Sequence, residues 1–171
     1  MADPVVIWIV DDVNNEAKLA WGVVEEVASA SRAELGMAPT VLWANGFQWP
    51  PFANFRVCVD PNASCVRSND YPSIVILDLF MPTTNGLKLE GNTFYYGLRE
   101  WEMSKPTKKK DKISFVVLWS PYQGDPAAKP FIADVEKNDR RLIPLATKSP
   151  ALLNTMLKDL WKRMLEERDE L

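Results

Sequence analysis

The chain has 171 residues, of which 47% are hydrophobic and 25% are charged, and it contains no histidine. This length and balance predict one soluble globular domain, and the net charge of −3 disfavours a general binder of nucleic acid or anionic membranes. Without histidine, neither a Ser-His-Asp or Cys-His catalytic site nor a histidine-ligated metal centre can be built.

The first predicted element is a buried strand over Val5–Val10, a continuous apolar run that ends at Asp11 and Asp12. A helix is expected from about Asn14 to Leu35, and Gly36 lies just past its end. Four apolar residues recur along this helix at roughly helical spacing: Leu19, Val23, Val27 and Ala30.

The next region has two credible strands, Thr40–Ala44 and Phe55–Val59, and the sequence does not decide which of them is strand two. An aromatic insertion near residues 45–59 and a short helix from Asp60 to about Ser68 are also expected. The aromatic side chains could form a docking patch, although a satellite core is favoured. They are Trp43, Phe47, Trp49, Phe52 and Phe55.

The second half alternates strands and helices more regularly. Strands are expected over residues 73–78, 113–120 and 141–146. Helices are expected over residues 92–103, within 130–138 and over 150–168, and an extended basic loop lies near 105–112. Five strand–helix repeats predict an α/β fold, a doubly wound parallel sheet with helices on both faces. We expect residues 1–171 to form a single domain.

The amino terminus has no basic region followed by a long apolar run, so no signal peptide is expected. No apolar segment approaches the roughly 20 residues that span a bilayer. The sequence therefore predicts a cytoplasmic protein without a membrane partner.

Polar residues follow four of the predicted strands: Asp11 and Asp12, then Asp78, Ser120 and Lys148. Since the carboxyl ends of parallel strands share one edge of a sheet, these residues should converge. Three adjacent carboxylates favour a cation such as Mg²⁺, while a lysine and a hydroxyl suit a phosphate-like anion. Taken singly, each could be a turn, a cap or a solvated surface residue; together they indicate phosphoryl transfer to Asp78.

Four segments, "IVDD", "LDLFMPTTNG", "VVLWS" and "LATK", resemble the motifs of the response-regulator receiver domain of two-component signalling. The resemblance runs from about Val5 to Leu165 and implies a flavodoxin-like, five-stranded parallel sheet in the order 2-1-3-4-5 that is known for this family. It implies that a partner histidine kinase or phosphotransfer protein phosphorylates Asp78, and that Ser120 and Lys148 contact the phosphoryl group. Candidate Mg²⁺ ligands are Asp12, Asp78, the backbone carbonyl of Phe80 and, through water, Asp11.

The leading interpretation is a stand-alone receiver that signals through protein–protein contacts, because no DNA-binding segment follows Lys148. Whether the chain forms a homodimer is left open.

The sequence departs from the family at Pro121, which follows the hydroxyl residue, and at Leu145, where many members carry an aromatic switch residue. These departures keep open a degenerate receiver that acts as a phosphate-independent interaction module. A Mg²⁺-dependent phosphatase is disfavoured, since Phe80 stands where those enzymes carry a second aspartate; the chain is not expected to be an enzyme.

Overall fold

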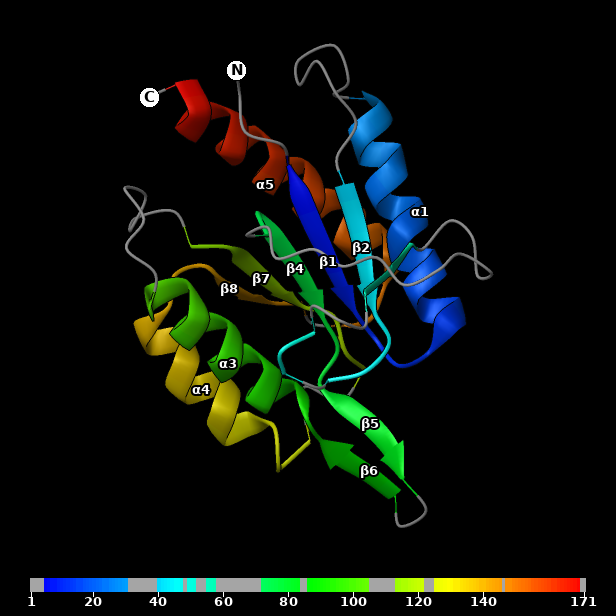
Figure 1. Cartoon of the computed structure of the whole chain (residues 1–171), viewed down its shortest axis with the longest axis vertical. Helices are drawn as coiled ribbons and strands as arrows, with labels where there is room; N and C mark the ends of the chain where they lie inside the picture. Colours follow the sequence, from blue (N-terminus) through cyan, green and yellow to red (C-terminus); the bar gives the residue numbers. More distant parts are fainter. Residues whose placement is uncertain are drawn as a thin grey trace.

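The structure is a computed structural model that describes residues 5–30, 40–47, 49–51, 55–57, 72–83, 86–104, 113–121, 125–145 and 147–169. One sheet forms the centre of the molecule (Figure 1). Its parallel strands are β1 (Val6–Val10), β2 (Thr40–Ala44), β4 (Ile74–Leu77), β7 (Phe115–Leu118) and β8 (Leu142–Pro144). β3 (Phe55–Val57) pairs antiparallel with β2, and the strand order is β3-β2-β1-β4-β7-β8.

The predicted order 2-1-3-4-5 is therefore confirmed for the five parallel strands. Thr40–Ala44 is strand two, because it pairs in parallel with β1. The competing segment contributes only the short antiparallel edge strand β3. The predicted helix over residues 60–68 and the basic loop over 105–112 lie outside the described residues.

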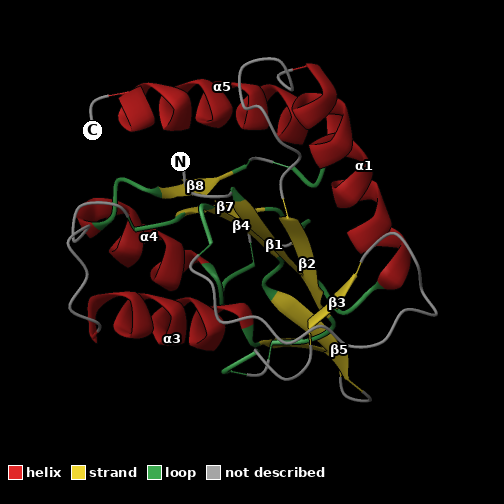
Figure 2. Ribbon diagram, turned by 45° about the horizontal axis from the view of Figure 1, so that its top comes forward, coloured by secondary structure: helices red, strands yellow, loops and turns green. Residues whose placement is uncertain are grey.

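Helices cover both faces of the sheet, as predicted (Figure 2). α1 (Asn14–Ala30) and α5 (Pro150–Asp169) lie on one face, and α3 (Gly91–Ser104) and α4 (Lys129–Asn138) lie on the other. Because successive side chains of a strand point to opposite faces, Ile7 and Ile9 pack beneath α1 and α5, whereas Trp8 packs beneath α3. None of the described helices is both long and apolar enough to cross a membrane.

The buried stripe of α1 differs in part from the expected one. Val23 and Val27 are buried as predicted, but Leu19 is 55% exposed and Ala30 is also exposed. The buried face instead includes small side chains such as Ala20, which let the helix approach the sheet closely.

A β-hairpin interrupts the alternation after β4 and was not predicted. β5 (Phe80–Thr83) and β6 (Gly86–Leu89) pair antiparallel as a separate two-stranded sheet that projects from the body (Figure 1). The chain leaves and returns at one point, because the amides of Glu90 and Gly91 both donate to the carbonyl of Leu79, at 3.0 and 2.9 Å. α3 starts directly at that point.

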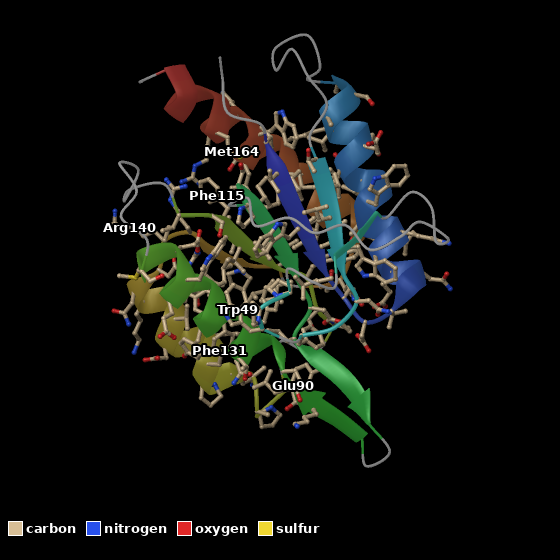
Figure 3. The ribbon with its side chains drawn as sticks, viewed as in Figure 1. Trp49, Glu90, Phe115, Phe131, Arg140 and Met164 are labelled. Carbon is tan, nitrogen blue, oxygen red and sulfur yellow. The ribbon has the colours of Figure 1, made fainter. Side chains whose placement is uncertain are left out.

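The described part of the aromatic insertion is packed into the core. Trp43 and Phe47 are buried, and Trp49 lies beside α3 (Figure 3). The Trp49 ring meets Phe94 edge-on, with ring centroids 5.3 Å apart, and a Cβ at Gly97 would come within 2.5 Å of it. Trp43, in β2, belongs to the core on the face of α1 and α5, whereas Phe47 and Trp49 pack in the core on the face of α3 and α4. The described aromatic side chains therefore join the main core and do not form the separate satellite core that was favoured; Phe52 and the side chain of Phe55 lie outside the described part of the chain.

A buried charged network ties α3 to the start of β7 and the end of α4. Arg99 donates to Glu102 at 2.7 Å, to Asp139 at 2.9 Å and to the backbone carbonyl of Ser114 at 2.9 Å. The Tyr95 hydroxyl also donates to Asp139, and the Ser114 amide donates to Glu102 at 2.8 Å. The Arg99 guanidinium thus neutralises two carboxylates that burial would otherwise destabilise.

Candidate functional site

Three aspartates lie together at the carboxyl edge of the sheet. Asp11 and Asp12 follow β1, and Asp78 follows the neighbouring β4. The sheet ladder continues to the site, since the amide of Asp78 donates to the carbonyl of Val10 at 3.0 Å. One carboxylate oxygen from each aspartate lies within 4.8 Å of the others. The predicted convergence of these three acids is therefore present.

Lys148, in the segment between β8 and α5, also lies beside these acids. Its Nζ lies 2.7 Å from Asp11 Oδ2, 3.3 Å from Asp78 Oδ2 and 2.5 Å from Glu16 Oε2. Burial lowers the pKa of Lys148, but the hydrogen bonds and charges of these carboxylates outweigh it and raise the pKa above its usual value. The ammonium therefore stays charged at neutral pH.

Burial also shifts the acids. It raises the pKa of Asp11 to about 6, against the opposing hydrogen bond and charge of Lys148. Burial likewise raises the pKa of Asp12. The cause is the same for both: a carboxylate that loses water favours its neutral form, and the charge of Lys148 offsets this only in part.

The donor set fits a hard divalent cation. Among the described residues, no hydrogen-bond donor reaches the buried Oδ1 of Asp12. A buried carboxylate oxygen without a donor, in a group of three carboxylates, is the arrangement that a cation with oxygen ligands would satisfy. Phe80, whose backbone carbonyl was expected to complete the ligand set, is the first residue of β5, and its side chain is buried in the core.

The two oxygens of Asp78 have different environments. Oδ1 accepts the amide of Leu79 at 2.8 Å, whereas Oδ2 faces Lys148. Ser120 is fully buried and lies at the same sheet edge, one residue past Trp119, whose amide donates to the carbonyl of Leu77 at 2.9 Å. The structure thus brings each predicted side chain to this edge.

Sequence reasoning missed one residue of the site, Glu16 in the first turn of α1. An acid in the first turn of a helix is commonly explained by the helix dipole, so its position alone gave no functional signal. The available clue was its place in the first turn of α1, because this helix begins just after Asp11 and Asp12 at the end of β1.

Comparison with solved structures relates this architecture to known ones. The chain is similar to a CheY-like response regulator receiver domain protein from Methanospirillum hungatei JF-1, with a TM-score of 0.51 and 14% identity over 98% of both chains. This chain has the fold of a response-regulator receiver domain. No family sequence model matches the chain, and no curated protein matches its sequence.

Two further structures are similar to the chain. The response regulator DrrB of Thermotoga maritima, an OmpR/PhoB homolog, has a TM-score of 0.45 and 16% identity over 95% of this chain and 54% of its own. The bacteriophytochrome response regulator AtBRR has a TM-score of 0.45 and 15% identity over 93% of this chain and 94% of its own.

Within the receiver fold, the two sequence departures have different surroundings. Leu145 is buried in the core beneath α1 and α5, and its amide donates to the carbonyl of Leu118 at 3.1 Å. Pro121 is exposed just after Ser120. The hairpin β5–β6 begins at Phe80, two residues after Asp78.

Proposed function

We propose that the chain is a cytoplasmic receiver domain that takes up a phosphoryl group on Asp78 and signals through protein contacts. The donor is a phosphohistidine on a partner kinase or phosphotransfer protein. The observation that carries the proposal is the contact of Lys148 with both Asp11 and Asp78, beside an Asp12 oxygen that no described donor reaches. The proposal treats residues 1–171 as one domain without enzymatic activity towards a separate substrate.

The nucleophile is Oδ2 of Asp78, because the Leu79 amide already holds Oδ1. Oδ2 attacks phosphorus, and the new O–P bond forms as the P–N bond of phosphohistidine breaks; the leaving imidazole takes a proton from water. Lys148 then donates to a phosphoryl oxygen, and the Ser120 hydroxyl supplies a second donor. Later attack by water on phosphorus releases inorganic phosphate and restores the carboxylate.

Asp11, Asp12 and Asp78, with the carbonyl of Phe80, would hold Mg²⁺. When bound, the ion supplies positive charge that offsets the repulsion between the carboxylates and the incoming phosphoryl group. The buried Asp11 and the oxygen of Asp12 without a described donor support this assignment, since both gain from a neighbouring cation.

The proposal is tested by intact mass after incubation with acetyl phosphate and Mg²⁺. We expect a gain of one phosphate, about 80 Da from phosphate chemistry, in the wild type and no gain in Asp78→Asn. Asp159→Asn is the matched control, because Asp159 is exposed on α5 and should leave uptake unchanged. Uptake that persists in Asp78→Asn would refute the assignment of the phosphoacceptor.

A second function has one specific observation in its favour. Leu145 is packed in the core where many receivers carry a mobile aromatic residue, so the usual switch has no counterpart at that position. A phosphate-independent interaction module would retain this fold without using Asp78. It predicts no mass gain with acetyl phosphate or with a range of phosphorylated kinases, although the protein is folded and Mg²⁺ is present.

A further inference from the structure

The ammonium of Lys148 has no spare donor in the structure. A lysine ammonium carries three N–H donors, and three carboxylates lie within hydrogen-bond distance of its Nζ: Asp11, Asp78 and Glu16. A phosphoryl oxygen on Asp78 also needs a donor from Lys148. At least one of the present contacts must therefore be exchanged when phosphate arrives.

Burial decides which contact is exchanged most readily. The side chains of Asp11 and Asp78 are 3% and 7% exposed, whereas that of Glu16 is 37% exposed. A buried carboxylate that loses its cation remains desolvated and unpaired, which is costly, but a carboxylate at the surface regains water. Glu16 is therefore the partner that Lys148 can leave at the lowest cost.

Charge acts in the same direction. A phosphoryl group adds negative charge to an edge that already carries four carboxylates, Asp11, Asp12, Asp78 and Glu16. Glu16 lies on the solvent side of the cluster and, unlike the three aspartates, has no part in the proposed cation site. It repels the incoming group and also occupies the lysine that the group needs.

We propose that Glu16 is a positioning residue that latches Lys148 in the unphosphorylated protein and releases it when Asp78 takes up phosphate. This inference rests on the proposed function. Glu16 thereby slows phosphate uptake, and the state of the site is transmitted to the first turn of α1, where the released carboxylate enters solvent.

The first experiment measures the latch without any phosphate. Urea unfolding of the wild type, Glu16→Gln, Lys148→Met and the double variant, all in chelator, gives the coupling between the two side chains. We expect the pair to stabilise the fold by about a two- to fivefold change in the unfolding equilibrium, the range for a partly exposed ion pair. Additive effects would overturn the latch, because no interaction would then exist to be broken.

The second experiment measures uptake from acetyl phosphate with Mg²⁺. Glu16→Gln should take up phosphate about two- to fivefold faster than the wild type, since Lys148 no longer has to leave a charged partner. Glu26→Gln is the matched control, because it removes the same charge from an exposed position further along α1. It should match the wild type.

The outcomes separate the latch from the function on which it rests. Uptake by the wild type with an equal or slower rate in Glu16→Gln would overturn the latch and leave the receiver function in place. Coupling in urea without uptake by any of these proteins would overturn the receiver function and the latch with it. Faster uptake in both Glu16→Gln and Glu26→Gln would show a general charge effect and would also overturn the latch.

Discussion

Replacement of Gly91 by alanine should disturb Asp78, the proposed phosphoacceptor, directly. Gly91 begins α3, and a Cβ at this position would lie 2.5 Å from the carbonyl oxygen of Asp78 and 2.8 Å from the Cα of Leu79. Both neighbours are backbone atoms, so neither can rotate away as a flexible side chain would. The added methyl group must push α3 away from the residue that carries the site.

Two opposing effects set the size of the change. Forcing a methyl group into a closely packed site costs about 1–3 kcal/mol. Alanine gains at most about 1 kcal/mol over glycine from helix propensity, and less at the first residue of a helix. We therefore expect Gly91→Ala to lose about 1–2 kcal/mol, which lowers Tm by about 2–8 °C for a chain of this length. Phosphate uptake should slow by about tenfold, because Asp78 is displaced.

Circular dichroism during heating and intact-mass kinetics measure the two effects. The matched control is Gly22→Ala on α1, where nothing lies within 4 Å of the new Cβ. This substitution should stabilise the protein by about 0.5–1 kcal/mol. If Gly91→Ala behaved like Gly22→Ala and took up phosphate at the wild-type rate, the close approach of α3 to Asp78 would be refuted.

Two further predictions concern buried charges. In chelator, the free energy of unfolding should rise as the pH falls from about 7 towards 4. Folding raises the pKa of Asp11 to about 6, so in this range the folded state holds a proton that the unfolded state lacks. Asp11→Asn should weaken this pH dependence in urea unfolding, and an unchanged dependence would contradict the prediction. Arg99→Met should lower the free energy of unfolding by about 3–5 kcal/mol, because Glu102 is left buried without its cation. The double variant Arg99→Met, Glu102→Met should lose less, and equal losses in urea unfolding would contradict the network.

The sheet could be predicted because its strands are continuous apolar runs bounded by polar residues. Ile74–Leu77 and Phe115–Leu118 are buried on both faces, which is the condition that produces such runs. The hairpin lacks this signal. Its strands have four residues each and lie outside the main sheet, and Pro82 within β5 favours a turn or an edge position.

The convergence of the acids could also be predicted, because each follows a parallel strand and the topology alone brings strand ends together. The structure places Asp11, Asp12, Asp78 and Lys148 accordingly. The contact of Glu16 with Lys148 could not be predicted in this way. It depends on the rotational orientation of α1 about its own axis. Close packing of small residues against the sheet sets this orientation, and the order of strands does not.

The hairpin and the site meet at Leu79. Because its carbonyl accepts both returning amides, from Glu90 and Gly91, the chain re-enters the body where it left, and α3 begins there. The hairpin is therefore a projecting element whose base lies next to Asp78 and to the start of α3. The same closure leaves no space for a side chain at Gly91. Gly91 is therefore required at the base of the hairpin, because a Cβ there would meet the backbone of both Asp78 and Leu79.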